Sequence, residues 1–242
     1  YWNLNSTVAF IGDMNWETGQ FVVDSYDEID GGLDFYAPQT CQGPNGERYM
    51  VAWMQMWQRS IPSHVLGHGW AGSMTVPRKL GLRDGRLVQE LPESVKDHFL
   101  VENAPETIVK GNQITIPARG KQTLFEIGAK SGRSFILSYG NESDADSALQ
   151  LIYDASNKRF SLSRDQFGHH ISGKENPEFQ SRWIQLDPEK DHHFSILRDT
   201  NSIEVFVDGK TLSMTFYETT ENPVYTFRAD EGVDLVVKTY QK

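Results

Sequence analysis

The chain has 242 residues, 38% of them hydrophobic, so it can bury a sizeable core in one large β domain or two small ones. Its net charge of −10 and its scattered lysines and arginines argue against a nucleic-acid partner. No stretch approaches the roughly 18 apolar residues that span a bilayer, and no signal peptide is visible, so we expect a soluble, cytoplasmic protein without a membrane partner. The single cysteine, Cys41, excludes an internal disulfide.

Short runs rich in Val, Ile, Phe, Tyr and Thr alternate with Gly, Asn and Asp, and no long segment keeps a helical apolar period. This pattern predicts an all-β fold. In chain order, the predicted strands are residues 7–11, 19–24, 34–40, 48–54, 73–77, 113–117, 122–127, 133–139, 148–153, 158–163, 193–198, 202–207, 210–217 and 233–239.

Turn sequences join several of these strands. They are Gly-Pro-Asn-Gly at 43–46, Arg-Asp-Gly at 83–85 and Asp-Gly at 208–209. Residues 91–105 lose the alternation and gain charge, which predicts a short helix or a connecting segment between a domain at 1–98 and a domain at 99–242. The strand spacing of the second domain predicts a β-sandwich, and the aromatic-rich strands of the first are typical of propeller blades.

The segment DGGLDFYAPQT at residues 30–40 resembles a string of glycoside hydrolase family 32, which contains the β-fructosidases called invertases, levanases and inulinases. The upstream FIGDMNWETGQF and the downstream Trp-Met, Gly-Trp-Ala-Gly and Pro-Arg-x-Leu strings keep the family's order. The strings FEIGAKSGRSFILSY and FSILRDTNSIEVFVDGKTLSMTFYE are similar to the family's sandwich module. The resemblance covers nearly the whole chain and implies a five-bladed propeller with an axial active site, followed by a β-sandwich.

The sequence also departs from the family pattern. The strings Trp-x-Asn-Asp-Pro-Asn-Gly, Arg-Asp-Pro and Glu-Cys, which carry the family's nucleophile, transition-state stabiliser and acid/base, do not occur. The resemblance therefore implies a partial propeller of about two blades, with open sheet faces and strand edges that need cover. We expect a homo-oligomer to cover them, or else a partner chain that carries the other half.

Retaining glycoside hydrolysis needs two carboxyl groups about 5 to 5.5 Å apart. The acids available before the family string are Asp24, Asp27, Glu28, Asp30 and Asp34. The resemblance implies that Asp34 faces the sugar, and the flexible Gly-Gly pair could let Asp30 converge with it. We predict Asp34, Asp30 and Glu28 as catalytic candidates, while an ordinary turn or surface acid stays the alternative for each.

Aromatic residues near the same string offer flat apolar faces to sugar C–H groups. The predicted substrate-binding residues are Phe35, Tyr36, Gln39, Trp53, Trp57 and Trp70. The resemblance implies that Trp53 lines the active-site funnel, whereas Trp57 and Trp70 either extend this platform or pack inside a blade. Phe35 and Tyr36 alternate along a strand, so only one of them can share the side of Asp34.

His64 and His68 have the i, i+4 spacing of a helical metal site, but Gly67 and Gly69 argue against a helix there, so we expect no metal and no cofactor. We predict a truncated β-fructosidase that releases fructose from sucrose or β-fructans through a site assembled in an oligomer. The alternatives are a non-catalytic fructan-binding or structural module, and a half-protein that needs a partner chain.

Overall fold

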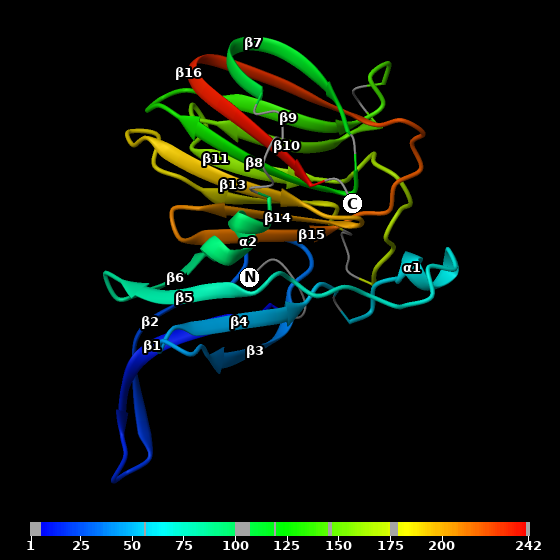
Figure 1. Cartoon of the computed structure of the whole chain (residues 1–242). Helices are drawn as coiled ribbons and strands as arrows, with labels where there is room; N and C mark the ends of the chain where they lie inside the picture. Colours follow the sequence, from blue (N-terminus) through cyan, green and yellow to red (C-terminus); the bar gives the residue numbers. More distant parts are fainter. Residues whose placement is uncertain are drawn as a thin grey trace.

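The computed structural model describes residues 6–55, 57–99, 107–118, 120–144, 147–174 and 179–240. These residues form a two-stranded hairpin, a four-stranded sheet and a ten-stranded sheet, which confirms the all-β prediction. Figure 1 shows the ten-stranded sheet stacked above the four-stranded sheet, with the hairpin projecting away from both. No helix in the described part of the chain is long and apolar enough to cross a membrane.

The first part of the chain contains the propeller blade strands that the sequence predicts. Its elements are the hairpin strands β1 (Val8–Asn15) and β2 (Gln20–Glu28), then β3 (Tyr36–Gln42), β4 (Arg48–Trp53), α1 (Pro62–Val65), β5 (Arg78–Arg83) and β6 (Arg86–Glu90). Strands β3 to β6 form one antiparallel four-stranded blade in sequential order. The strand predicted at 73–77 is wrong, because that segment contributes only an isolated bridge between Met74 and Trp53.

Two hairpins rest on Asp-Gly turns, as predicted. Asp84 and Gly85 between β5 and β6 have φ of 51° and 69°, and Asp208 and Gly209 between β14 and β15 have φ of 53° and 79°. Positive φ at both central residues is the backbone of a type I′ turn, whose twist matches the flanking strands. The second turn contacts β6, since the Gln89 N–H donates to the Gly209 carbonyl at 2.9 Å.

The second part of the chain is a β-sandwich. It follows α2 (Glu93–His98), which lies in the segment predicted as a helix or a connector. Its strands are β7 (Thr107–Pro117), β8 (Gln122–Ala129), β9 (Phe135–Gly140), β10 (Leu149–Asp154), β11 (Arg159–Ser163), β12 (Ser181–Gln185), β13 (His192–Arg198), β14 (Ser202–Val207), β15 (Lys210–Thr215) and β16 (Val224–Tyr240). Strand β16 pairs with β9 along its first half and with β8 along its second, so it joins the two layers.

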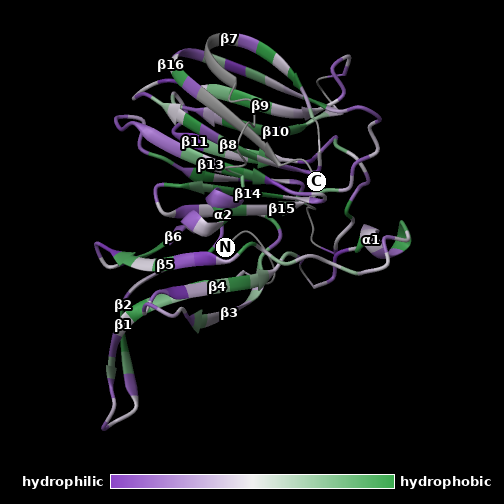
Figure 2. Cartoon of the chain, viewed as in Figure 1, coloured by the Kyte–Doolittle hydropathy of each residue, from purple (hydrophilic) through white to green (hydrophobic). Residues whose placement is uncertain are grey.

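The main core lies between these two layers. Alternate residues of β10 are buried, and the Phe135 ring centroid lies 5.0 to 6.3 Å from those of Phe160, Phe194 and Phe227. Burying each such side chain contributes about 1.5 to 3 kcal/mol before entropy losses. Figure 2 shows the hydrophobic residues gathered along the sandwich strands, while α2 is hydrophilic. The sandwich therefore has an extensive hydrophobic core of its own.

Candidate functional site

The family-like string at residues 30–34 lies along the outer edge of β15. The Gly31 N–H donates to the Thr211 carbonyl at 2.8 Å, and the Leu33 N–H donates to the Ser213 carbonyl at 2.9 Å. Strand β15 ends the ten-stranded sheet, so its backbone groups would otherwise stay unpaired. The string therefore closes a sheet edge and joins the propeller part to the sandwich.

The two glycines of this string allow the close approach. A Cβ atom on Gly32 would lie 2.0 Å from the Ser213 carbonyl oxygen, and one on Gly31 would lie 2.3 Å from the Ile184 side chain. Neither glycine has the positive φ that favours glycine in turns. Both glycines therefore allow a close approach, since an added Cβ atom on either one would force a neighbouring atom to move.

Asp30 is buried at this joint. Its Oδ1 accepts hydrogen bonds from the Ser213 N–H at 2.8 Å and the Gly32 N–H at 2.7 Å, and its Oδ2 accepts from Arg78 at 2.8 Å. The same Arg78 donates to Glu204 Oε2 at 2.9 Å. Burial would lower the pKa of Arg78, but Asp30 and Glu204 outweigh burial and raise that pKa. Asp30 therefore belongs to a charged network without solvent access.

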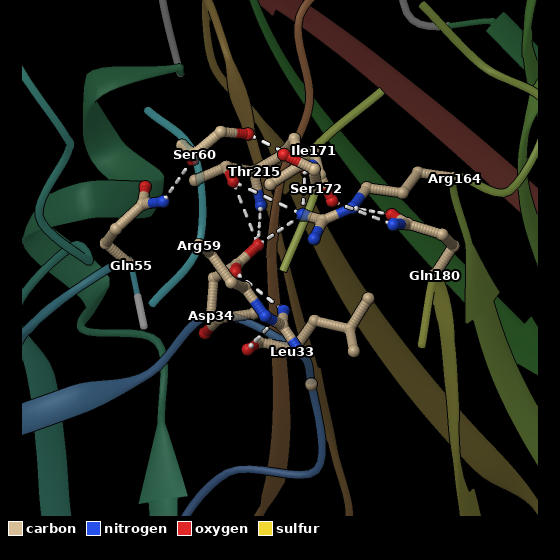
Figure 3. Close-up of polar contacts among 12 residues, drawn as sticks. Leu33, Asp34, Gln55, Arg59, Ser60, Arg164, Ile171, Ser172, Gln180 and Thr215 are labelled. Carbon is tan, nitrogen blue, oxygen red and sulfur yellow. Dashed lines mark hydrogen bonds and ion pairs between the residues drawn. The ribbon is translucent and has the colours of Figure 1, made fainter. Parts of the chain in front are cut away.

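Asp34 is 0% exposed and is held in the same way (Figure 3). Its Oδ2 accepts hydrogen bonds from the Thr215 N–H at 2.8 Å and from Arg164, while its Oδ1 lies 3.3 Å from Arg59 Nη1. Arg164 is fixed in turn by a hydrogen bond from its Nε to Gln180 Oε1 at 2.9 Å. Burial lowers the pKa of Arg164; Asp34 opposes that shift, and the Arg59 charge adds to it. One carboxylate thus serves two buried guanidinium groups.

Glu28 completes the predicted catalytic set. Its Oε2 lies 2.9 Å from Arg182, and its Oε1 accepts a hydrogen bond from the Ser6 hydroxyl at 2.7 Å. Each of the three predicted carboxylates therefore has its own arginine partners. Asp30 pairs with Arg78, Asp34 with Arg59 and Arg164, and Glu28 with Arg182. This geometry places Asp34 and Asp30 in buried ion pairs at the joint between the string and β15. Their catalytic role stays a prediction without geometric support.

The aromatic residues after the string are more accessible. Tyr36, Trp53 and Trp57 form a cluster that we call the aromatic ledge, with ring centroids 5.4 Å apart for the two tryptophans and 6.2 and 6.5 Å for the pairs with Tyr36. The rings meet edge to face, and Trp57 is 56% exposed. A Cβ atom on Gly72 would lie 2.7 Å from Trp53 Nε1, so this glycine lets the chain pass close behind the ledge.

A bulge in β3 sorts the side chains of this segment. Ala37 has φ of 48°, and the pairing with β4 shifts register between Tyr36 and Gln39. Phe35 is buried beneath the Arg78 guanidinium at 4.8 Å, whereas Tyr36 pairs directly with Trp53. Gln39 is exposed further along β3. Bulges often reorient side chains next to active sites, and here Phe35 and Tyr36 have separate surroundings.

Trp70 lies apart from the aromatic ledge. Its ring is 53% exposed and lies 5.4 Å from the His68 ring in a tilted arrangement, and His68 lies 6.2 Å from the ring of Tyr217 in the sandwich. Helix α1 ends at Val65, so His64 and His68 do not share one helical face. Burial inside the blade, which the sequence offered as an alternative for Trp57 and Trp70, does not occur.

Sequence reasoning missed the partners of the carboxylates. Strand β15 points Thr211, Ser213 and Thr215 toward the string, and each hydroxyl donates to Asp30 or Asp34 at 2.9 to 3.0 Å. Leucine and methionine alternate with these residues and enter the sandwich core. The alternation of hydroxyl and apolar residues in KTLSMT was the available signal, since it indicates a strand with one polar buried face.

Two family models match this chain. Residues 1–91 match the model of the glycosyl hydrolases family 32 N-terminal domain, and residues 89–241 match the model of the glycosyl hydrolases family 32 C terminal. The two matches together cover nearly the full sequence and agree with the strings from which the resemblance was drawn.

Individual proteins give the same picture. The chain is 31% identical over 202 residues to a sucrose-6-phosphate hydrolase of Zymomonas mobilis. This match covers 79% of the chain and 37% of the Zymomonas protein. It is 30% identical over 231 residues to a raffinose invertase of Escherichia coli. This match covers 90% of the chain and 44% of the Escherichia coli protein. The chain therefore spans less than half the length of these two relatives.

Solved structures share the fold. The sucrose-6-phosphate hydrolase of Lactobacillus gasseri superposes with a TM-score of 0.82 at 22% identity, over 96% of this chain and 47% of that one. A GH32 β-fructofuranosidase of Bombyx mori gives a TM-score of 0.78 at 19% identity, over 100% of this chain and 48% of that one. The arrangement of a propeller blade against a sandwich is thus common to all three.

Proposed function

Because the chain belongs to glycosyl hydrolase family 32, we propose that it forms part of a β-fructosidase that hydrolyses terminal fructosyl linkages of sucrose or of β-fructans such as inulin and levan. The observation that carries this proposal is the aromatic ledge, which begins at Tyr36 after the family string and exposes Trp57 to solvent. Relatives named as a sucrose-6-phosphate hydrolase and a raffinose invertase support the substrate class.

The ledge would bind the apolar C–H face of a fructosyl unit. The exposed ring of Trp57 offers the area, and the edge-to-face contacts with Trp53 and Tyr36 hold that ring in one orientation. A rigid ring loses little entropy on binding, so the sugar is positioned at low cost. This chain thus contributes substrate positioning to the reaction.

The reacting carboxylates need a separate source. Hydrolysis requires one carboxyl group that protonates the leaving oxygen and a second that attacks or activates water. Since Asp30 and Asp34 are saturated with hydrogen bonds, we propose that the pair comes from a second copy of the chain or from a partner chain placed against the ledge. The active site would then be assembled by association.

The hairpin supports such an association. Cross-strand pairing puts an apolar row on one face of β1 and β2, and every member of the row is exposed: Phe10, Met14, Phe21, Val23 and Tyr26. The hairpin has only two strands among the described residues, so both of its edges are open to further strands. Apolar sheet faces of this kind are ordinarily covered in a folded protein.

A non-catalytic fructan-binding module is the second candidate. The complete engagement of Asp30 and Asp34 in ion pairs favours it, because binding at the aromatic ledge requires no free carboxylate. Under this alternative the ledge still binds fructosyl units, but the sugar is released unchanged. The two candidates therefore differ in turnover and agree in binding.

The purified chain should be assayed for fructose release from sucrose, inulin and levan, with its native mass measured in the same buffer. We expect an oligomer that releases fructose, and Trp57→Ala should weaken sugar binding at least about tenfold, which is about 1.4 kcal/mol. Trp70→Ala is the matched control, since its ring is equally exposed but outside the ledge. A monomer that binds fructan without turnover would favour the binding module, and equal binding by Trp57→Ala would remove the ledge from both candidates.

A further inference from the structure

A short segment of the chain contacts both the aromatic ledge and the sandwich. It consists of residues 72–76, and we call it the backing segment. Met74 forms an isolated antiparallel bridge with Trp53 of the ledge. A Cβ atom on Gly72 would lie 2.7 Å from Trp53 Nε1, so the segment also passes close to the indole ring. The position of this segment therefore bears directly on the position of one ledge ring.

Three hydrogen bonds tie the backing segment to the end of β4. The Met54 N–H donates to the Ser73 carbonyl at 2.8 Å, and the Thr75 N–H donates to the Ala52 carbonyl at 2.9 Å. The Ala52 N–H donates in turn to the Thr75 hydroxyl oxygen at 3.0 Å. These bonds involve the residues directly before and directly after Trp53, so the backbone that carries the ring is held on both sides.

Two side chains of the sandwich hold the opposite side of the backing segment. Glu204 on β14 accepts a hydrogen bond from the Val76 N–H at 2.8 Å. Asn201 lies in the turn before β14, and its Nδ2 donates to Ser73 Oγ at 3.1 Å, while the Ser73 hydroxyl lies 3.3 Å from Asn201 Oδ1. The sandwich therefore contacts the segment near both of its ends.

Strand β14 is a firm support for these contacts. Ile203, Val205 and Val207 enter the sandwich core, so the alternation of the strand turns Glu204 toward the blade. A buried carboxylate is costly unless it is paired, and Glu204 Oε2 accepts a hydrogen bond from Arg78 at 2.9 Å. Side chains in a close-packed core move little, so the turn that begins this strand is held in place.

We propose that Asn201 is a positioning residue for the aromatic ledge, because its side chain fixes the backing segment that adjoins the Trp53 ring. The contacts run from Asn201 through Ser73 to the Met54 N–H, directly after the ledge tryptophan. A ring fixed in one orientation loses little entropy when a sugar binds to it. The benefit to sugar binding rests on the proposed function, whereas the orientation of the ring does not.

The orientation of the ring can be tested without a sugar. The full chain is produced with fluorotryptophan, and the fluorine NMR signal of Trp53 is assigned by its absence from Trp53→Phe. Asn201→Ala removes the amide that holds Ser73 but keeps the backbone carbonyl that accepts from the Phe216 N–H. We expect the Trp53 signal to shift or broaden in Asn201→Ala, while the signal of Trp16 at the tip of the β1–β2 hairpin stays unchanged.

Ser73→Ala removes the other partner of the same hydrogen bonds. It should change the Trp53 signal in the same way, and the double variant Asn201→Ala/Ser73→Ala should add nothing further, because the two side chains act as one unit. Asn141→Ala is the matched control, since its side chain bonds to Ser143 within its own loop of the sandwich. It should leave the Trp53 signal where the parent chain has it. Ser73→Ala keeps the test decisive if Asn201→Ala fails to fold.

Titration of the same variants with 1-kestose measures the effect on sugar binding. Under the proposed function, Asn201→Ala should weaken binding about fivefold, which is the usual weight of one hydrogen bond. A Trp53 signal that stays unchanged in both Asn201→Ala and Ser73→Ala would overturn the positioning role, even if both variants unfold at lower urea concentration. Sugar binding by the parent chain that Asn201→Ala retains in full would overturn it as well. A parent chain that binds no sugar, combined with a shifted Trp53 signal in the variants, would count against the proposed function and support the positioning role.

Discussion

Replacement of Asp34 by Asn separates a structural role from a catalytic one. The change keeps the shape of the side chain but removes the charge that faces Arg59 and Arg164, and all three groups are almost fully buried. Removing one partner of a buried ion pair costs about 3 to 5 kcal/mol, because the remaining charge stays uncompensated. Two guanidinium groups share Asp34, so we expect the upper part of that range. This is a large fraction of the about 5 to 15 kcal/mol that stabilises a typical domain.

Urea unfolding followed by tryptophan fluorescence measures this loss. Asp24→Asn is the matched control, since Asp24 belongs to the same acidic cluster but is exposed, and its change should stay within about 0.5 kcal/mol. The double variant Asp34→Asn/Arg164→Gln should recover part of the loss, because neighbouring groups in one network couple by about 0.5 to 3 kcal/mol. An Asp34→Asn chain that unfolds like the parent yet releases no fructose would refute the structural role and restore the catalytic one.

Two other predictions concern the joint and a sandwich turn. Gly32→Ala places a Cβ atom 2.0 Å from the Ser213 carbonyl oxygen, so it should lower the unfolding free energy by at least about 1 to 3 kcal/mol. Gly128→Ala is the control, because its Cβ atom meets no other atom within 4 Å. Equal urea midpoints for the two variants would contradict this prediction. Hydrogen bonds from Ser156 and Asn157 lower the pKa of Asp154 to about 2, below its usual 3.8, so its contribution to stability is complete above the usual value and disappears as the pH falls through about 2. Asp154→Asn should therefore flatten the fall of Tm between pH 4 and pH 2, and parallel Tm profiles would exclude this.

Local sequence signals were sufficient for most of the fold. The turn at Asp208 and Gly209 has the two residues that a type I′ turn requires, and the flanking alternation leaves one register for β14 and β15. Strands β5, β6 and β12 were missed because charged residues interrupt their apolar pattern. Arg78 illustrates the reason: its side chain is fully buried in β5, which only its distant partners Asp30 and Glu204 make tolerable.

The candidate site was predictable only in part, since its contacts join distant segments. Asp34 and Arg164 are separated by 130 residues, and nothing near Asp34 in the sequence announces a buried arginine. The aromatic ledge was easier to predict, because Tyr36 and Trp53 lie on neighbouring strands of one blade and Trp57 follows shortly after. Burial of a carboxylate depends on a partner from another sheet, whereas an aromatic cluster within one blade depends on local pairing.

The string at residues 30–34 also links the stability of the joint to the position of the aromatic ledge. The same short segment is hydrogen-bonded to β15, holds Asp34 against two arginines and continues directly into the bulge that turns Tyr36 toward the ledge. If Asp34 is loosened from Thr215, the start of β3 loses its anchor, and Tyr36 loses its fixed position against Trp57. Under the proposed function, the geometry of the aromatic ledge therefore depends on an intact joint, and we expect loss of the Asp34 contacts to weaken sugar binding.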